Sequence, residues 1–374
     1  MALSGERFRV VYGLAGSEAQ VRINAQRICL EQTVELPEEG VPAGFIRDEV
    51  VGRIEGLEPG LAGFEVTVSY AVETAAAELP QFINLVFGNI SILPGIQVLR
   101  FDLTPTFFAK FPGPQLGRVG LRELLGVPKR PLLCAALKPM GFSAVQLAEM
   151  AYQLALGGID LIKDDHGLTN QAFAPFEERV QRCADAVARA NHQTGEHSLY
   201  IPNVTAPFDQ IVARAHFAKK AAAGGLLICP ALTGLDAMRC LAKDESLRLP
   251  ILSHPAFQGS YLTSPGNGMS HFSLLGQLTR LAGADAVIFP NYGGRFAFSQ
   301  AECFSIVAGT ETAMDSIKTI FPCPGGGMTL ERIPELMEVF GREVIFLMGG
   351  GLLGHSPDLR ANACYFRELV NSLS

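Results

Sequence analysis

Three features are missing from the 374-residue sequence: a basic tract, a closely spaced cysteine pair and a long apolar run. The formal net charge is −7, so without a basic tract we expect no nucleic-acid surface. None of the eight cysteines forms a C-x-x-C pair and several lie inside apolar runs, so we expect buried, reduced thiols. No apolar run reaches the ~20 residues that span a bilayer, and the first residues lack a signal-peptide core. We therefore expect a soluble, cytoplasmic protein without membrane contacts.

Charged residues are also few, at 18%, whereas hydrophobic residues make up 48% of the chain. This composition supports a large core and excludes extensive disorder. The length is sufficient for two domains, or for one large barrel with a smaller domain.

From residue 131 onward, short apolar runs alternate with amphipathic segments. The eight runs cover residues 131–139, 158–165, 197–206, 224–234, 249–257, 284–294, 317–327 and 343–351. The segments between them, such as 142–158 and 208–225, have the apolar spacing of helices. Strands that alternate with helices indicate parallel β-α units, and eight of them fit a (β/α)₈ TIM barrel.

Polar residues and glycines follow these runs, which favours a barrel over an open doubly wound sheet. They are Lys138, Lys163, Asp165, Asn203, His254, Asn291, Gly326 and Gly350. Barrel enzymes carry their chemistry at this face, whereas an open sheet would not place polar groups after every strand.

Residues 1–125 have a different pattern and predict an N-terminal α+β domain of the ferredoxin-like kind. Extended segments are expected over 7–15, 38–58 and 63–73, and helices over 17–32 and 78–93. Pro128 and Pro131 interrupt the pattern near "LRELLGVPKRP", so we expect the barrel domain over 126–374.

The stretch "GGIDLIKDDHGLTN" (157–170) places charged residues directly at the end of an apolar run. Residues two apart on a strand face the same way, so Lys163 and Asp165 can point together into the barrel mouth, and His166 can join them if the strand ends there. One interpretation is a buried ion pair. The other is that CO₂ carbamylates Lys163, which then supplies anionic oxygens and, with Asp165, holds a hard cation.

Several motifs resemble RuBisCO and the RuBisCO-like proteins. In the barrel these are "LKPMGFS", "GGIDLIKDDHGLTNQAF", "NVTA", "LSHPAF", "PCPGGGMTLERIPEL" and "FLMGGGLLGH". A weaker match in the N-terminal part includes "FGNISILPGIQVLRFDL" and "KFPGPQLG". The order and the spacing of these motifs make a chance match very improbable.

The resemblance implies a role for each matching polar residue. Lys163 corresponds to the carbamylated lysine and Asp165 to a metal ligand. Lys138 corresponds to the lysine that polarises the substrate and moves protons, and His254 to a histidine that binds substrate hydroxyls. Asn203 is expected among the substrate-binding residues.

The resemblance also implies a phosphate site and a partner subunit. Gly326, Gly327, Gly349 and Gly350 match glycine loops whose backbone N–H groups hold a phosphate, although a bare glycine run could equally be a turn. Glu31 and Gln81 lie where the N-terminal domain of one subunit reaches into the site of the other. An antiparallel homodimer is therefore expected.

Four departures from the family pattern limit the expected chemistry. His166 replaces a glutamate ligand, so a role as metal ligand and a role as base or substrate contact both stay open; imidazole also suits Mn²⁺, Fe²⁺ or Zn²⁺ better than Mg²⁺. Met140 replaces a lysine, and Arg295 stands where the carboxylase has a mobile lysine. We therefore expect that CO₂ fixation is lost.

The fourth departure concerns the second phosphate of the family's substrate. Pro255, Ile288 and Gly325 stand where that phosphate finds an arginine, a histidine and a serine. A second dianion would be buried without partners, so we expect a substrate with one phosphate.

What remains is enolisation that depends on Mg²⁺ or Mn²⁺ and acts on a singly phosphorylated keto sugar or keto sugar acid, in an isomerase or tautomerase reaction. An alternative is decarboxylation of a phosphorylated β-keto sugar acid, as in apiose catabolism, with Arg295 gripping a carboxylate. A further alternative is a non-catalytic sugar-phosphate-binding relative. Retention of Lys138, Lys163, Asp165 and His254 together speaks against this last interpretation.

Overall fold

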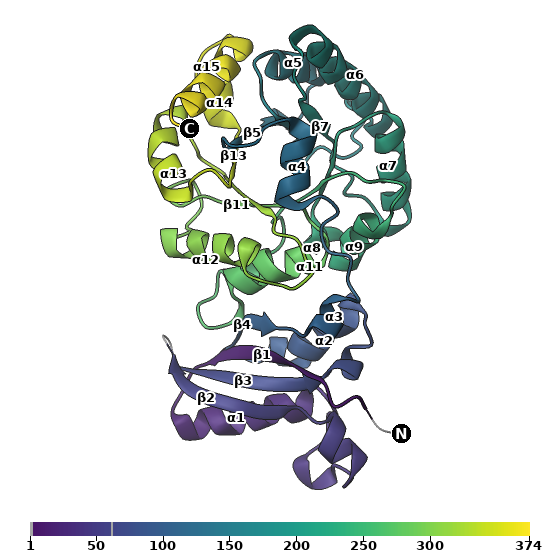
Figure 1. Cartoon of the computed structure of the whole chain (residues 1–374), viewed down its shortest axis with the longest axis vertical. Helices are drawn as coiled ribbons and strands as arrows, with labels where there is room; N and C mark the ends of the chain where they lie inside the picture. Colours follow the sequence, from purple (N-terminus) through teal and green to yellow (C-terminus); the bar gives the residue numbers. More distant parts are fainter. Residues whose placement is uncertain (1–2, 61–62) are drawn as a thin grey trace.

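The chain forms two domains (Figure 1), seen in a computed structural model that describes residues 3–60 and 63–374. The N-terminal domain contains an antiparallel sheet in the strand order β4-β1-β3-β2, and β10 adds to its β4 edge. In chain order its main elements are β1 (Arg7–Leu14), α1 (Glu18–Glu31), β2 (Arg53–Gly60), β3 (Gly63–Ala71), α2 (Leu79–Phe87) and β4 (Ile96–Asp102). This β-α-β-β-α-β order confirms the predicted ferredoxin-like arrangement.

One local prediction in this domain is wrong, and one strand was missed. The first half of the segment 38–58 forms helical turns at Glu38–Gly40 and Ile46–Val50. Between these turns Pro42 lacks the N–H that a ladder needs, and Gly44 takes a φ of +78°. The strand β4 was not predicted because Leu99 is an extra residue opposite β1, which breaks the apolar alternation of β4.

The second domain is the predicted (β/α)₈ barrel. Its strands are β5 (Leu132–Leu137), β6 (Leu161–Asp164), β7 (Leu199–Ile201), β8 (Leu226–Ile228), β9 (Ile251–Ser253), β11 (Ala286–Pro290), β12 (Phe321–Gly325) and β13 (Ile345–Met348). They form two parallel four-stranded sheets, β13-β5-β6-β7 and β12-β11-β9-β8. A bridge between Asn203 and Leu227 joins β7 to β8, and β12 lies beside β13, so the barrel closes.

Helices surround these strands as a ring in Figure 1. The longer ones are α5 (Ala144–Leu156), α6 (Phe176–Thr194), α7 (Phe208–Lys220), α9 (Leu235–Lys243), α12 (Gln300–Glu311), α13 (Ile333–Phe340) and α15 (Leu359–Ser372). The shorter helices and turns of the barrel domain are α4 (Gly117–Leu125), α8 (Pro230–Thr233), α10 (Gly259–Leu262), η5 (Phe272–Leu278), α11 (Thr279–Leu281) and α14 (Gly350–Leu353). The short helix α3 (Pro105–Phe108) belongs to the N-terminal domain, where Phe107 packs against Phe8 and Phe82.

The sequence determines these helices locally. In α5, Ser143 and Gln146 form a reciprocal capping box, and the buried residues Leu147, Ala151 and Leu154 recur at helical spacing. The strands are apolar on both sides because one side fills the barrel and the other packs under the helices. A polar residue on a strand is therefore conspicuous, and those at the mouth are the ones predicted above.

Helix α4 packs at the amino-terminal end of the barrel. Its residues Leu121 and Leu125 belong to the apolar cluster inside the barrel, and the guanidinium of Arg122 lies 5.1 Å from the centre of the Phe321 ring. Figure 1 shows α4 within the ring of barrel helices. The sequence placed the domain boundary after residue 125; we propose instead a boundary just before Gly117, because α4 is packed as part of the barrel.

The segment after β9 connects the two domains. Its short strand β10 (Gly268–Met269) pairs in parallel with β4, and Asn267 Oδ1 accepts from the N–H of Gly95 at 2.7 Å. Further along, the amide of Gln277 accepts from the N–H and donates to the carbonyl of Phe101 at 2.8 and 2.7 Å. The loop that begins at His254 is thereby held against the N-terminal sheet.

Asp285 is a buried carboxylate that joins the start of α4 to β9. Its Oδ1 accepts from the N–H groups of Leu116 and Gly117 at 2.9 and 2.6 Å, and its Oδ2 accepts from Ile251 at 2.9 Å. Burial raises the pKa of Asp285 to about 6, although the three backbone donors favour the anion.

We predict that Asp285→Asn lowers the free energy of unfolding by about 1–3 kcal/mol, because an amide N–H would face a backbone donor. The wild-type carboxyl has a folded pKa of about 6, above the ~3.9 of an unfolded chain. The contribution of this carboxyl to the free energy of unfolding is therefore fully present below about pH 4, and it declines as the pH rises through 6.

Urea unfolding at about pH 4.5 and about pH 7.5 measures this difference. The free energy of unfolding that Asp285→Asn loses relative to the wild type should be larger at the lower pH. Asp209→Asn, on the surface of α7, serves as the control and should change stability by no more than about 0.5 kcal/mol at either pH. An equal deficit at both pH values would contradict the titration of Asp285.

Candidate active site

Lys163 lies near the end of β6 with its side chain on the barrel-interior side. It follows the interior residue Leu161 by two positions, and only 2% of its surface is exposed. Its Nζ donates to the carbonyl oxygen of Asp164 at 2.8 Å. Among residues 3–60 and 63–374, no carboxylate oxygen lies within 4.0 Å of this amine. The ion pair considered for Lys163 is therefore not the arrangement in the structure.

Asp165 pairs with Lys138 instead. Lys138 follows β5, and its Nζ lies 2.8 Å from Asp165 Oδ2, while His166 Nδ1 lies 2.6 Å from Asp165 Oδ1. Burial alone would raise the pKa of Asp165, but the hydrogen bonds from His166 and Lys138 and the charge of Lys163 lower it well below its usual range. The carboxylate stays ionised and connects both neighbours.

His166, which contacts this carboxylate, stacks on His254. Their ring centres are 4.4 Å apart and the planes differ by 10°. Burial is the main cause that lowers the pKa of His254 to about 2, with the charge of Lys163 acting in the same direction, so its imidazole is neutral. Its Nδ1 accepts from the N–H of Ala256 at 3.2 Å, which leaves the proton on Nε2. His254 can therefore donate a hydrogen bond to a substrate oxygen.

The neighbouring Asp164 belongs to the fold, because it points to the other side of β6. It is fully buried with Arg179 of α6, whose Nε lies 3.1 Å from Asp164 Oδ2. The hydroxyl of Tyr200 and the N–H of Asn203 also donate to this carboxylate, at 2.8 and 3.0 Å. Arg179 also donates to the carbonyl oxygens of Thr169 and Ala174, so it holds the segment that follows His166.

Asn203 holds the same segment and is placed differently from its predicted role. Its Nδ2 donates to the carbonyl oxygens of His166 and Leu168 at 2.8 and 3.0 Å, and its Oδ1 accepts from the N–H of Thr205 at 3.1 Å. The side chain is completely buried. These partners favour a supporting role over the substrate contact expected from the sequence.

The two predicted phosphate loops follow β12 and β13, and the loop after β13 adjoins Lys138. Gly326 and Gly327 follow β12 with φ values of +80° and +99°, which L side chains rarely adopt. After β13, a Cβ placed on Gly349 would lie 3.7 Å from Cε of Lys138. Gly350 begins α14, and a Cβ on the next residue, Gly351, would meet the carbonyl oxygen of Met328 at 2.3 Å. The two glycine loops therefore touch each other.

Arg295 lies in the loop after β11. Its side chain is exposed, and its guanidinium lies 5.0 Å from the centre of the Phe296 ring. A Cβ on Gly326 would meet this ring at 3.2 Å. Met140, in the loop after β5, covers Gly167 and is 54% exposed. Arginine and apolar side chains thus surround the mouth where the family pattern has lysines.

Glu31 and Gln81 are not brought to the barrel mouth by any contact within the chain that the structure records. Glu31 Oε1 accepts from Asn89 Nδ2 at 3.0 Å, and Gln81 Nε2 donates to the carbonyl of Thr74 at 3.2 Å. Both partners lie in the N-terminal domain.

Lys163, Asp165 and His166 fit a divalent cation only if Lys163 carries a carbamate. An ammonium repels cations, and without Lys163 only Asp165 and His166 are left as ligands. Consistent with this, residues 3–60 and 63–374 contain no group of three or more His, Cys, Asp or Glu side chains that could hold a metal. A carbamate adds anionic oxygens, and the resulting set suits Mg²⁺ or Mn²⁺.

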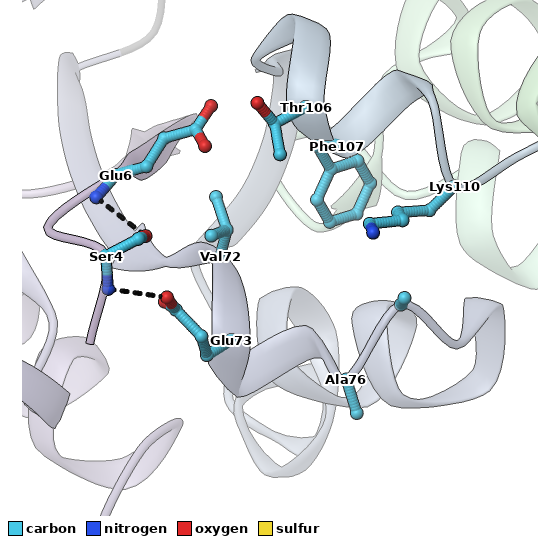
Figure 2. A pocket seen from close by; sticks show the side chains of 9 residues that line it. Ser4, Glu6, Val72, Glu73, Ala76, Thr106, Phe107 and Lys110 are labelled. Carbon is cyan, nitrogen blue, oxygen red and sulfur yellow. Dashed lines mark hydrogen bonds between the residues drawn. The ribbon is translucent and has the colours of Figure 1, made fainter. Parts of the chain in front are cut away.

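The chain also has two surface cavities away from this mouth. One, of about 420 Å³, lies in the N-terminal domain between the start of the chain and α3 (Figure 2), and Glu6, Glu73 and Lys110 contribute its charged groups. The other, of about 500 Å³, lies beside α4 and Lys318. Neither contains a predicted site residue, whereas two lysines, a carboxylate and two imidazoles converge at the barrel mouth, which is the candidate active site.

The thiol prediction is confirmed for most of the cysteines. All eight are free of disulfides, and six are buried, whereas Cys240 is exposed and Cys364 is partly exposed. In the described ranges no helix combines the length and apolarity that a membrane crossing needs.

Sequence reasoning missed Arg179, although a signal was present. In α6 the buried positions Phe176, Val180 and Cys183 define one apolar face, and Arg179 lies on it. An arginine on the buried face of an amphipathic helix requires an anionic partner, because an unpaired buried charge is costly.

A family model described as the ribulose bisphosphate carboxylase large chain, catalytic domain, matches residues 117–371. Ribulose bisphosphate carboxylase-like protein 1 of Rhodopseudomonas palustris is 40% identical over 368 residues, covering 98% of both chains. A 5-methylthioribulose-1-phosphate isomerase of Rhodospirillum rubrum is 36% identical, covering 93% of this chain and 92% of that protein.

A 2,3-diketo-5-methylthiopentyl-1-phosphate enolase of Bacillus pumilus is 33% identical, covering 87% of this chain and 80% of that protein. Among solved structures, the RuBisCO-like protein from Rhodopseudomonas palustris superposes with a TM-score of 0.87 at 34% identity, covering 98% of each chain.

We predict that Asn203→Ala lowers the free energy of unfolding by about 1–3 kcal/mol and speeds amide hydrogen exchange over residues 165–171, because two buried carbonyl groups lose their donor. Phosphate affinity should not change. The matched control is Asn191→Ala, which removes a similar pair of bonds to Ser198 at the end of α6. It should destabilise the protein without faster exchange over 165–171. A tenfold loss of phosphate binding in Asn203→Ala alone would restore the substrate-contact role.

Proposed function

This chain belongs to the RuBisCO large-chain family, and on that premise we propose that it enolises a singly phosphorylated keto sugar or keto sugar acid without fixing CO₂. The observation that carries the proposal is the ion pair between Lys138 Nζ and Asp165 Oδ2 at 2.8 Å, beside the buried amine of Lys163. A pure binding site needs no second lysine at the same mouth. The names of relatives, an isomerase and an enolase of phosphorylated C5 ketones, agree with this chemistry.

Lys138 is the residue that we assign to the reacting carbonyl. Asp165 holds its amine in the mouth, and Gly349 leaves room beside it. The amine of Lys138 takes the α-proton as a base, and the ammonium so formed stabilises the negative charge that develops on the substrate oxygen. The ammonium then returns the proton to the substrate, at the other carbon for an isomerisation.

Lys163 as a carbamate, Asp165 and His166 would hold Mg²⁺ or Mn²⁺. When bound, such a cation supplies Lewis-acid stabilisation of the enediolate. Within the protein, Asp165 orients His166, and the neutral His254 donates from Nε2 to a substrate hydroxyl.

The substrate is assigned one phosphate, held by the N–H groups of the loops at Gly326–Gly327 and Gly349–Gly350. At the position of the family's second phosphate, Pro255 has no N–H, Ile288 fills the barrel interior and Gly325 packs against Leu347. None of these residues offers a side-chain donor to a second dianion. Arg295 and Met140 in place of lysines support the absence of carboxylation.

Glu31 and Gln81 enter the proposal through a second copy of the chain. Because their recorded partners lie in their own N-terminal domain, they would reach substrate only across an antiparallel homodimer, as the family resemblance implies. The active site would then be shared between subunits.

The test of the proposed function is deuterium uptake from D₂O into 5-methylthioribulose 1-phosphate and related ketose monophosphates, followed by NMR with bicarbonate and Mg²⁺. We expect uptake at the carbon next to the carbonyl, and no uptake into a ketose bisphosphate. Lys138→Met should slow uptake at least ~10²-fold, because it removes the proton carrier. Lys219→Met, a change on the surface of α7, should have no effect.

The outcomes distinguish the alternatives. Release of CO₂ from a phosphorylated β-keto sugar acid would identify a decarboxylase with the same enolate. Binding of monophosphates without any deuterium uptake would identify a non-catalytic relative. Incorporation of labelled bicarbonate into product would overturn the absence of carboxylation.

We further predict that ¹³C-bicarbonate gives a carbamate resonance that Lys163→Met abolishes and that Lys219→Met retains. Mn²⁺ affinity, followed by electron paramagnetic resonance, should fall at least ~10-fold in Lys163→Met and in Asp165→Asn, because each removes an anionic donor. A carbamate resonance that persists in Lys163→Met, or an Mn²⁺ affinity that neither substitution changes, would contradict the proposed cation site.

A further inference from the structure

The loop after β11 is fastened to α13 by three residues, Tyr292, Arg332 and Glu335, which we name the clasp. The Tyr292 hydroxyl donates to Glu335 Oε1 at 2.7 Å. Arg332 donates to both oxygens of Glu335 at 3.2 Å and to the carbonyl oxygen of Tyr292 at 3.1 Å. Its guanidinium also lies 5.2 Å from the centre of the Tyr292 ring. Each member contacts the other two.

These contacts outweigh those of an ordinary surface ion pair. Exposed pairs contribute little, because water screens them and long side chains lose entropy. Here Arg332 is bidentate to one carboxylate, stacks on an aromatic ring and binds the backbone of the loop itself. A Cβ on Gly293 would meet the Arg332 guanidinium at 3.1 Å, so the loop backbone lies directly against it.

The same loop is also packed against the glycine loop after β12. The N–H of Arg295 donates to the carbonyl oxygen of Gly326 at 3.3 Å. A Cβ on Gly294 would lie 2.2 Å from that oxygen, and a Cβ on Gly327 would lie 2.9 Å from the nitrogen of Arg295. The two backbones are in contact at glycines, so neither loop can shift without the other.

Arg295 is the charged side chain that this arrangement presents. Its guanidinium stacks on Phe296, whose ring edge lies against Gly326. Within the described part of the chain no carboxylate lies within 4.0 Å of it, whereas Arg332 of the clasp is paired. An exposed guanidinium beside a glycine loop has the fork of donors that a phosphate accepts.

We propose that the Tyr292–Arg332–Glu335 clasp positions Arg295 as a phosphate contact beside Gly326–Gly327, so that this loop is a fixed wall of the phosphate site. The inference rests on the proposed function only in taking these glycines as the phosphate site. Arg295 touches the ligand, whereas the three clasp residues act through it. From the sequence, Arg295 was considered as a ligand of a substrate carboxylate; here we propose that it binds the substrate phosphate.

The test measures the Kd of inorganic phosphate by isothermal titration calorimetry on the whole chain. Arg295→Met should raise the Kd at least ~10-fold, since it removes charged donors. Tyr292→Phe removes one hydroxyl and should raise the Kd about 2- to 5-fold, and Glu335→Ala about 5-fold. Glu335→Gln keeps an acceptor for the Tyr292 hydroxyl, so it should recover part of the affinity. The double variant Tyr292→Phe/Glu335→Ala should equal Glu335→Ala, because the hydroxyl has already lost its partner.

A matched control and a second measurement separate positioning from general destabilisation. Glu311→Ala breaks a similarly exposed ion pair, with Arg118 at 3.2 Å, and should leave the Kd unchanged. Amide hydrogen exchange over 291–298 should quicken in Tyr292→Phe and Glu335→Ala but not in Glu311→Ala.

The proposal is overturned if Arg295→Met binds phosphate as the wild type does, or if the clasp variants stay within about 1.5-fold of the wild-type Kd. Phosphate binding that is absent from the wild type would overturn it as well. If phosphate binding responds as expected while no ketose monophosphate takes up deuterium, the clasp stands and the proposed enolisation fails.

Discussion

The alternation of side chains along β6 distributes consecutive charged residues between two environments, and the rest of the mouth depends on it. Lys163 and Asp165 belong to the interior side, whereas Asp164 faces α6 and is buried with Arg179. Two buried charges of opposite sign are tolerated because Tyr200, Asn203 and two backbone carbonyls complete their hydrogen bonds. If one partner were removed, the other would be left as an uncompensated buried charge, which is far more costly than replacing both.

The hydrogen bonds around Asp164 and Arg179 set the geometry of the residues at the barrel mouth. Arg179 and Asn203 hold the backbone from His166 to Ala174, so the position of Asp165 and His166 does not depend on their own contacts alone. Asp165 then connects Lys138 from β5 with His166, and His254 from β9 stacks on His166. Residues from three strands converge because parallel strands of a barrel all end at one face. Preorganisation of this kind is what enolate chemistry requires, since charge must be stabilised where it develops.

The N-terminal domain and the loops after β11, β12 and β13 also support the barrel mouth. The pairing of β10 with β4 fixes the far end of the segment that begins at His254, so the N-terminal sheet supports the mouth from outside. The loops after β11, β12 and β13 also touch in sequence through glycines: a Cβ on Gly294, Gly327 or Gly351 would collide with the backbone of the neighbouring loop. At Gly327 glycine is required both for this close approach and for the positive φ of +99°. The interpretation of the loop after β12 as a phosphate loop therefore has a steric basis beyond the resemblance of the motifs.

The sequence by itself determined the eight barrel strands, the helices between them, the α+β character of the N-terminal domain and the set of polar residues at the strand ends. Each of these follows from period, capping or spacing, which act over a few residues. It did not determine β4, whose alternation is broken by a bulge against β1, nor the turns over 38–50. It could not tell that Asp165 pairs with Lys138 and not with Lys163, that Asn203 supports a loop, or that Arg332 and Glu335 fasten Tyr292. These pairings join residues that are tens of positions apart, and only the closed barrel, by fixing which strand ends are neighbours, decided which charges meet.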